Sequence, residues 1–350
     1  MPSKIRLALI GIGNCASSFL QGLQYYSEDD SKPGLWHVKV GGYAIADLEV
    51  VTALDIDSRK IGLDVANAAF TRPNVAQKHM ELKPIGVSVK KGILKDSLSS
   101  HLRNLIDPLS GSEEELLSAL REDSVDIVVN LISSGLDDSS RAYALASLNA
   151  GCSFVNATPS VVASDPSLST RFSNSKLVLA GDDLLSQFGG TAFHKGILDL
   201  MHSRSITILR SYQLDVGGGA ETLNTLDERI RGLKREMKSS AIAVELPYEV
   251  ETVAGTTDYV DYMQNNRTSY FLIEGRGFLG SEARVDIYLR TSDGPNAGNV
   301  LFDLIRAVKA AKDRGEYGAV PQICSYGFKK SPRTSKLGQA QAAFAVSFVG

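Results

Sequence analysis

The sequence is poor in the residues that build disulfide frameworks and metal sites. Only three of its 350 residues are cysteines, and Cys15, Cys152 and Cys324 lie far apart. An odd number of cysteines outside any Cys-x-x-Cys pattern argues against a disulfide scaffold and a structural zinc site. The five histidines are scattered as well, so a bound metal stays unknown. These thiols fit a reducing compartment, and we expect a cytoplasmic protein.

An excess of one charge and long apolar runs are also lacking. The formal net charge is -3, which favours neither a nucleic-acid partner nor a membrane surface. No apolar run approaches the ~18 residues that a membrane span needs. Residues 7–10 are apolar and follow basic residues, as in a signal peptide. However, Gly11 and Gly13 interrupt the stretch and no small-residue cleavage site follows, so we interpret it as a first strand.

The hydrophobic pattern predicts an α/β fold with a doubly wound, Rossmann-type parallel sheet. Short aliphatic runs alternate with helical patterns over the first ~155 residues, as in βαβ units. A polar stretch bearing glycine and proline, residues 27–42, is expected to be an inserted loop. Strands are expected at residues 7–10, 45–56, 125–132, 152–157 and 177–180, and helices at residues 17–26 and 139–150.

The pattern changes in the second half of the chain. Residues 206–287 contain alternating strand-like runs with few crossover helices, which predicts an antiparallel or mixed sheet. A charged helix is predicted at residues 222–238. Residues 299–314 form a strongly amphipathic helical pattern, and we expect that helix to pack back on the first sheet.

A Gly-x-Gly-x-x-Ala pattern separates the first strand from the helix that follows it. Gly11 allows a tight turn, and Gly13 allows the backbone to approach a pyrophosphate. Ala16 lets the helix and the strand pack closely, and the helix N-terminus stabilises the phosphate charge. Asn14 could add a side-chain donor, and Cys15 lies in the same turn. The pattern predicts a dinucleotide site but is weak when taken alone.

Asp55 strengthens the dinucleotide hypothesis because it is expected to close the second strand. A carboxylate there accepts a hydrogen bond from a ribose hydroxyl and repels a 2′-phosphate, which favours NAD over NADP. Its separation from Gly13 exceeds the usual ~20 residues, and the inserted loop at residues 27–42 would explain the difference. The alternative for Asp55 is a solvated carboxylate at a strand end.

Two turns follow other predicted strands and are candidates for the nicotinamide end of the site. Ser133 follows one strand, and Ala157 and Thr158 follow another. In a doubly wound sheet, ligands bind beyond the carboxyl ends of the strands. Ordinary turn chemistry is the alternative for each of these residues.

A Gly-Asp-Asp sequence follows the strand predicted at residues 177–180. Asp182 and Asp183 could bind a cation, a cofactor hydroxyl or an ammonium group, although Asp182 could equally cap the next helix. Ser186 opens a run of small and hydroxyl-bearing residues of the kind that cradles a phosphate. Lys234 and Lys238 share one face of a predicted helix, and by pattern alone that face is solvated.

In combination, these motifs resemble the myo-inositol-1-phosphate synthase family, and more closely its actinobacterial-type members. The resemblance runs in order along nearly the whole chain. It includes GIGNCASSFLQGLQYY, PGLWHV, ALDIDSRKIGLD, GCSFVNATPSVVASDP, GDDLLSQFGGTAFH, QLDVGGG, IEGR, PNAGNVLFDLIRAVKAAKDRG and KKSP.

The resemblance implies a Rossmann domain plus a mixed α/β domain for catalysis and tetramerisation. We therefore expect an NAD-binding domain at residues 1–195, a catalytic and oligomerisation domain at residues 196–295, and a C-terminal segment, residues 296–350, that returns to the first domain. It also implies a redox-neutral conversion of glucose 6-phosphate to 1D-myo-inositol 3-phosphate by a homotetramer. The implied steps are oxidation at C5, enolisation at C6, aldol closure onto C1 and reduction.

The resemblance also implies catalytic residues. Lys234 and Lys238 match the family's Lys-x-x-x-Lys pair, and Lys330 looks like its C-terminal catalytic lysine. Asp258 resembles the acid of a Ser-Asp-aromatic-Val motif, and Asp183 belongs to the family's Gly-Asp-Asp. Lysine ammoniums at these positions would stabilise enolate and alkoxide oxygens and the substrate phosphate.

Several positions depart from the family pattern. Leu185 replaces a lysine, Gly219 an asparagine and Glu221 an aspartate, and another lysine is missing near Arg267 and Thr268. A guanidinium is a permanent cation and cannot exchange protons as lysine does. Two alternatives therefore stay open: a related carbocycle-forming or sugar-phosphate-oxidising enzyme with another substrate, or an NAD-binding paralogue without turnover.

Overall fold

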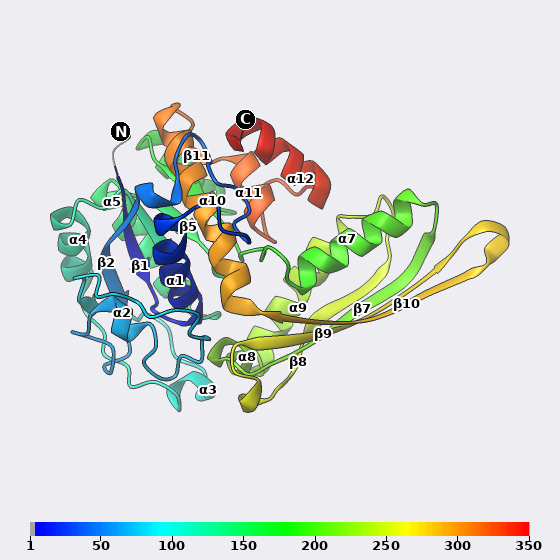
Figure 1. Ribbon diagram of the computed structural model, residues 1–350, viewed down its shortest axis with the longest axis horizontal. Helices are drawn as coiled ribbons and strands as arrows, with labels where there is room; N and C mark the ends of the chain where they lie inside the picture. Colours follow the sequence, from blue (N-terminus) through cyan, green and yellow to red (C-terminus); the bar gives the residue numbers. More distant parts are fainter. Residues whose placement is uncertain (1–3, 350) are drawn as a thin grey trace.

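Two β-sheets organise residues 4–349, the part of the chain that the computed structural model describes (Figure 1). The first sheet has the strand order β11-β6-β5-β4-β1-β2-β3, and its strand pairs are parallel. Apart from β11, this is the strand order of a Rossmann fold, so the predicted fold class is confirmed. The strands are β1 (Ile5–Ile10), β2 (Leu48–Asp55), β3 (Val89–Lys91), β4 (Ile127–Asn130), β5 (Ser153–Asn156), β6 (Val178–Ala180) and β11 (Gly318–Ala319).

Alternating side chains of β1 pack into two different apolar layers, because successive residues of a strand face opposite sides of the sheet. Leu7 and Leu9 belong to the layer formed with α1 and α10, whereas Ala8 and Ile10 belong to the layer formed with α4, α5 and α6. The sheet is therefore covered on both faces. These helices are α1 (Asn14–Glu28), α4 (Glu113–Glu122), α5 (Asp137–Ala150), α6 (Pro166–Asn174) and α10 (Asp293–Asp313), and the shorter α2 (Val65–Ala68) and α3 (Ser100–Arg103) lie between β2 and β4 in the chain.

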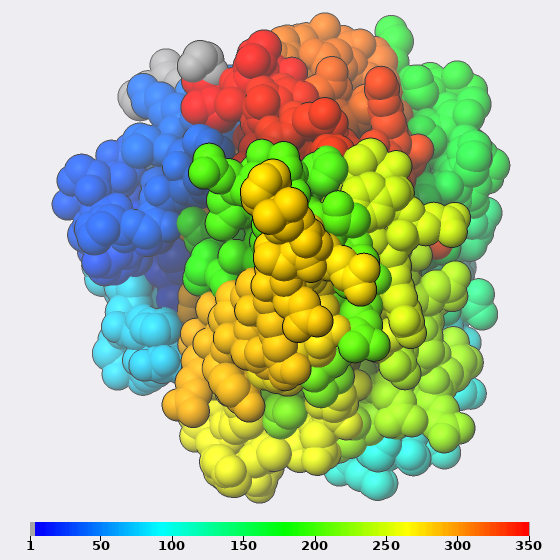
Figure 2. All heavy atoms as spheres, turned by 90° about the vertical axis from the view of Figure 1, so that its right-hand side faces the viewer, coloured from blue at the N-terminus to red at the C-terminus, as the bar shows by residue number. Residues whose placement is uncertain are grey.

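The second sheet has the order β10-β9-β7-β8, with antiparallel pairs except for the parallel pair β7–β8. The expected mixed sheet is thus present. Apolar side chains of α7 and α9 cover one of its faces, and the β9–β10 hairpin extends away from the first sheet (Figure 1). Figure 2 views this end, with the hairpin in gold at the front. The elements are β7 (Thr207–Gly217), β8 (Glu251–Tyr259), β9 (Asn266–Arg276), β10 (Glu282–Ser292), α7 (Gly190–Ser203) and α9 (Glu228–Ala243).

The chain returns to the first sheet after β10, as expected. Val300, Leu304 and Ile305 of α10 are fully buried in the same layer as β1. The strand β11, the helix α11 (Pro321–Gly327) and the helix α12 (Leu337–Phe344) then complete this side of the molecule. The division at residues 195 and 295 stays a prediction, because sheet membership alone does not define a domain boundary.

Two predicted elements differ in the structure. The helix predicted at residues 222–238 is broken into α8 (Ala220–Asn224) and α9. The helical pattern is interrupted at Asp227, the N-cap of α9. Its side chain accepts hydrogen bonds from the backbone N–H groups of Arg229 and Ile230. The strand predicted at residues 45–56 starts only at Leu48, after a single 3-10 turn.

Candidate active site

A cavity of about 350 Å³ lies between the two sheets. Turns that follow β1, β2, β4 and β5 line one side, and side chains from β7, α8, α9, β9 and α10 line the other. The strand order changes direction between β1 and β4, where a doubly wound sheet binds its ligand. The architecture therefore places a ligand site within reach of both sheets.

The glycine turn forms the floor of this cavity. Gly11 has φ +86°, and a Cβ there would meet the backbone of Leu131 and Ile132 at 3.0 Å, so glycine is required. Gly13 is the N-cap of α1 without a side-chain cap, and a Cβ added to it would meet nothing within 4 Å. Open space above an uncapped helix N-terminus is what a pyrophosphate needs.

The other residues of the glycine motif divide into two groups. Asn14 and Cys15 line the cavity, and the Asn14 side chain accepts from the Val75 backbone N–H at 2.8 Å. Burial raises the pKa of the Cys15 thiol to about 12, so it is a neutral thiol. Ala16 is fully buried and packs between helix and sheet; it is not among the residues that line the cavity.

Asp55 lines the cavity at the end of β2, but its carboxylate already has partners. One oxygen accepts from the Ile12 backbone N–H at 2.7 Å, and the other accepts from the Asp57 backbone N–H at 2.9 Å. Lys60 forms an ion pair with it at 3.3 Å. The sequence reasoning missed this buried lysine. Its only signal was a basic residue shortly after the strand-end aspartate.

An apolar pocket adjoins Asp55. It is built by the connections after β2, β3 and β4, and it provides the kind of surface on which an adenine ring packs. Its lining residues are Ile56, Leu98, Leu102, Ile106, Ile132 and Leu136. The uncapped helix start, the carboxylate and this pocket lie in one cavity, so the residues present fit a dinucleotide.

The residues predicted near the nicotinamide end line the cavity, with the exception of Asp182. The wall includes Ser133, Ala157, Thr158, Asp183 and Ser186. Asp182 is fully buried behind it and accepts hydrogen bonds from the Asn156 side chain and from three backbone N–H groups at residues 162–164. Its side chain therefore holds the loop together instead of facing the cavity.

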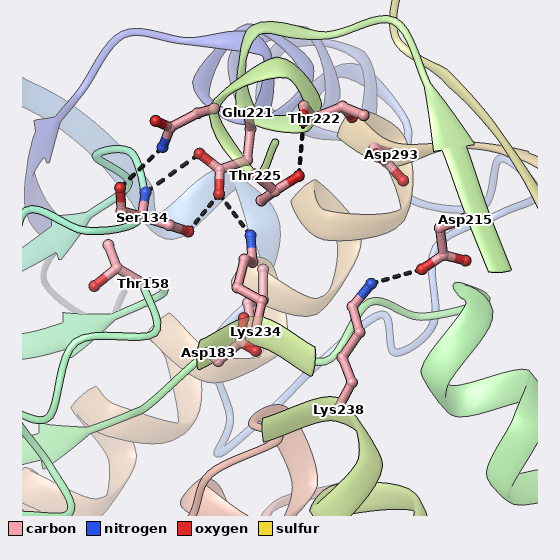
Figure 3. Close-up of polar contacts among 12 residues, drawn as sticks. Ser134, Thr158, Asp183, Asp215, Glu221, Thr222, Thr225, Lys234, Lys238 and Asp293 are labelled. Carbon is pink, nitrogen blue, oxygen red and sulfur yellow. Dashed lines mark hydrogen bonds and ion pairs between the residues drawn. The ribbon is translucent and has the colours of Figure 1, made fainter. Parts of the chain in front are cut away.

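Lys234 is fixed at the junction of the two sheets (Figure 3). Its ammonium donates to Glu221 at 2.5 Å, and the same carboxylate accepts from the backbone N–H and the hydroxyl of Ser134. Burial alone would raise the pKa of Glu221. The attraction of the Lys234 cation and the hydrogen bonds from Lys234 and Ser134 outweigh the effect of burial, so the pKa of Glu221 is lowered. Glu221 thus stays ionised and joins α9 to the turn after β4.

Lys238, one turn further along α9, points into the cavity beside β7 (Figure 3). Its ammonium donates to Asp215 at 2.6 Å. Asp215 also accepts from the Ser269 hydroxyl at 2.6 Å and from the Gln213 amide at 2.8 and 3.0 Å. Burial would raise the pKa of Asp215, but the Lys238 and Arg267 cations lower it. For Lys238, burial lowers the pKa against the opposing effect of Asp215.

Arg267 lies beside this pair but is held by a second carboxylate. Its Nε atom donates to both Asp293 oxygens at 2.9 Å, and its Nη2 atom lies 2.7 Å from one of them. Its Nη1 atom lies 3.6 Å from Asp215. Burial would lower the pKa of Arg267, but Asp293 and Asp215 raise it, so this side chain is a permanent cation.

The C-terminal lysine that the structure places in the cavity wall is Lys329, whereas Lys330 was predicted from the sequence. The Lys329 ammonium donates to Asp183 and to the Leu184 carbonyl, both at 2.9 Å. Lys330 lies outside the cavity lining and is joined to Asp182 through backbone hydrogen bonds. Asp258 is exposed on β8 and accepts from the backbone N–H of its neighbour Tyr259. The structure therefore does not bring Lys330 and Asp258 together with the other candidates.

Comparison with known proteins identifies the family. The family profile described as Myo-inositol-1-phosphate synthase matches residues 189–294. The chain is 34% identical over 341 residues to an inositol-3-phosphate synthase of Corynebacterium glutamicum, with 94% of each chain covered. The chain belongs to the inositol-3-phosphate synthase family. The resemblance drawn from the motifs is confirmed, and with it the expected enzyme class, an inositol-3-phosphate-synthase-like isomerase.

Solved structures support the fold. The crystal structure of Ari2 has a TM-score of 0.78 and 29% identity, with 99% of each chain covered. A myo-inositol-1-phosphate synthase-related protein from Thermotoga maritima has a TM-score of 0.81 at 21% identity, with 98% of each chain covered, and supports the fold. Family membership and the Rossmann-type sheet together indicate a nucleotide cofactor.

Residues 4–349 lack two other kinds of feature. No helix in this range is long and apolar enough to span a membrane. Nor do these residues contain a group of three or more histidine, cysteine, aspartate or glutamate side chains placed to hold a metal ion.

Proposed function

We propose that this protein converts glucose 6-phosphate to 1D-myo-inositol 3-phosphate with NAD as a regenerated cofactor. The observation that carries the proposal is the convergence of three lysine ammoniums and a dinucleotide cradle on one cavity. Lys234 and Lys238 reach it from α9, Lys329 reaches it from the C-terminal segment, and Gly11 and Gly13 form its floor. Membership of the inositol-3-phosphate synthase family supports this substrate and product.

NAD fits the cradle through the groups described above. The N-terminus of α1 would hold the pyrophosphate, Asp55 a ribose hydroxyl, and the apolar pocket the adenine ring. When bound, NAD would accept a hydride from the sugar and return it within the same turnover. Ser133, Ala157 and Thr158 lie where the reacting end of the cofactor would meet the sugar.

The lysines supply the charge stabilisation that enolisation and ring closure need. Each step develops negative charge on a sugar oxygen, and preorganised ammoniums in a buried site lower the barrier for such charge. Lys238 donates one hydrogen bond to Asp215, and Lys234 donates one to Glu221. Each ammonium has three N–H donors, so the others can bind the substrate. Burial lowers the pKa of Lys238, and Asp215 opposes that shift.

The test is a product assay. Purified protein incubated with glucose 6-phosphate and NAD is expected to form inositol phosphate, detected by mass spectrometry, without accumulation of NADH at 340 nm. Steady NADH formation would identify an ordinary dehydrogenase. Bound, intact NAD without any product would reject the proposal and favour the paralogue without turnover.

A second candidate keeps the reaction class and changes the sugar phosphate. Arg267 has its guanidinium fork occupied by Asp293, and Leu185 lines the cavity as an apolar side chain. Both would alter the contacts of a sugar hydroxyl or phosphate that free lysines would otherwise bind. Faster turnover of fructose 6-phosphate than of glucose 6-phosphate would select this candidate, and strict preference for glucose 6-phosphate would remove it.

The remaining expectations are part of the same proposal. We propose a cytoplasmic homotetramer without a nucleic-acid or membrane partner. Light scattering of the purified protein would measure its mass in solution, and a monomeric mass would contradict the tetramer. The catalytic roles of Asp258, Asp183 and Lys330 stay predictions.

A further inference from the structure

Asp215 is a buried carboxylate in the cavity wall for which the sequence motifs provided no role. It lies near the end of β7, is completely inaccessible to solvent, and accepts hydrogen bonds from three side chains. Ser269 reaches it from β9, and Gln213 lies two residues earlier on the same face of β7. A carboxylate bonded from several directions has one orientation.

The space around this carboxylate is shaped to keep that orientation. A Cβ added to Gly190 would lie 2.3 Å from the Gln213 amide nitrogen and 3.0 Å from the Ser269 hydroxyl. Glycine at the start of α7 therefore leaves room for both donors. Behind them, His194 is neutral because burial lowers its pKa to about 4, so it adds no charge to the cluster.

Lys238 depends on this carboxylate for its position. Asp215 is the side chain to which its ammonium donates within residues 4–349. The lysine is itself largely buried, at 8% exposure. One strong hydrogen bond from an ionised donor to an ionised acceptor fixes the direction of the ammonium and leaves its other protons facing the cavity.

Other charges act on Lys238 from the neighbouring elements. Arg267 on β9 and Lys329 after α11 are cations that favour loss of its proton. Lys234 on its own helix is paired with Glu221 of α8, Lys329 is paired with Asp183, and Arg267 is paired with Asp293 of α10. Asp215 is thus the carboxylate that directly opposes deprotonation of Lys238.

We propose that Asp215, held by Gln213 and Ser269, is a positioning residue that orients the Lys238 ammonium and sets the pH range in which it stays protonated. The proposal deepens the proposed function, and its kinetic arm rests on it. The reacting group is Lys238, and Asp215 acts through that group. Removal of the Asp215 charge leaves Lys238 between two cations, so its proton should be lost at lower pH.

The first experiment measures Lys238 directly and requires no turnover. Wild type and Asp215→Asn are labelled with acetic anhydride between pH 6 and pH 10, and acetylation of Lys238 is measured by peptide mass spectrometry. Exposed Lys83 serves as the internal reference. We expect the labelling midpoint of Lys238 to fall by about one pH unit or more in Asp215→Asn, a tenfold change in the proton equilibrium. An unchanged or higher midpoint overturns the proposal.

The second experiment separates positioning from charge. Ser269→Ala removes one hydrogen bond to Asp215 while both charges remain, so kcat should fall about tenfold, equivalent to ~1.4 kcal/mol, with KM unchanged. Ser211→Ala is the matched control, because Ser211 is buried in the same sheet and contacts Thr252 instead. Equal kcat values for Ser269→Ala and Ser211→Ala overturn the positioning role, whether or not Asp215→Asn folds.

The pH profile links the two experiments. If protonated Lys238 stabilises the developing oxyanion, kcat falls as the pH rises through its pKa. In Asp215→Asn that fall should begin at lower pH, whereas a merely structural defect would lower kcat equally at every pH. A profile of unchanged shape overturns the proposal. Absence of turnover in wild type would reject the proposed function, and the labelling curve would still decide the role of Asp215.

Discussion

In the part of the cavity formed by the second sheet, α9 and the C-terminal segment, the charged side chains form ion pairs. A buried cation without a partner would lose its charge or its position, since desolvation disfavours the ionised form. Each pair therefore keeps a donor ionised and directed before a substrate arrives, which reduces the cost of ordering it later. The pairs are Lys234 with Glu221, Lys238 with Asp215, Lys329 with Asp183, and Arg267 with Asp293.

The two adjacent C-terminal lysines give the sharpest prediction at this scale. Lys329→Ala should lower kcat by about 10²- to 10³-fold, because it removes an ammonium held in the cavity wall by Asp183. Lys330→Ala, the matched neighbour, should lower kcat less than tenfold, since its side chain lies outside the cavity lining. Steady-state kinetics with a saturating sugar phosphate measures both. The reverse ranking would support the catalytic role assigned to Lys330 from the sequence.

The sequence predicted the parts of the site that depend on short-range pattern. Gly11 and Gly13 follow a strand and Asp55 ends one, and a strand end can be recognised from a few neighbouring residues. Asp215 and Arg267 could not be assigned in this way, because their partnership joins positions 52 residues apart. Lys329 and Lys330 are distinguished only by which side chain the turn after α11 directs inward, and no periodic pattern specifies that direction.

At the scale of elements, α10 packs distant parts of the chain against each other. Its apolar residues complete the layer beside β1, and its first turn supplies Asp293 to the cavity. The periodicity of residues 299–314 predicted the helix and its return to the sheet. The break between α8 and α9 was missed because the cap at Asp227 lies within a continuous charged pattern.

Arg306 provides the test of this packing. It is fully buried in α10, forms an ion pair with Asp303 at 2.9 Å, and donates to the carbonyls of His37 and Val38 in the inserted loop. Arg306→Met should lower the free energy of unfolding by about 3–5 kcal/mol, because the buried Asp303 carboxylate loses its paired cation and the two carbonyls lose their donor. Urea unfolding measures the change.

Arg171→Met is the control for that experiment, since Arg171 is exposed on α6. Its effect should stay within about 0.5 kcal/mol. A loss below about 1 kcal/mol for Arg306→Met, by contrast, would mean that the inserted loop is not anchored by this residue.

At the scale of the whole molecule, the cavity depends on contacts that join the two sheets. Asn224, fully buried at the end of α8, connects three segments. Its amide nitrogen donates to the Ser134 carbonyl at 2.9 Å, and its amide oxygen accepts from the Ser99 hydroxyl at 2.7 Å. Ser99 precedes α3, whose Leu102 lines the apolar pocket, and Ser134 lies in the turn after β4. One side chain therefore holds both ends of the proposed cofactor site against the second sheet.

Asn224→Ala should weaken NAD binding although Asn224 is not among the residues that line the cavity. The variant removes the acceptor of the Ser99 hydroxyl and the donor to the Ser134 carbonyl, and the segments on either side of the cofactor lose their fixed spacing. We expect the Kd for NAD to rise about tenfold, or ~1.4 kcal/mol, as measured by isothermal titration calorimetry. Asn149→Ala, on the exposed surface of α5, should leave the Kd unchanged. A lower Tm for Asn224→Ala with an unaltered Kd would show that Asn224 stabilises the fold without ordering the cofactor site.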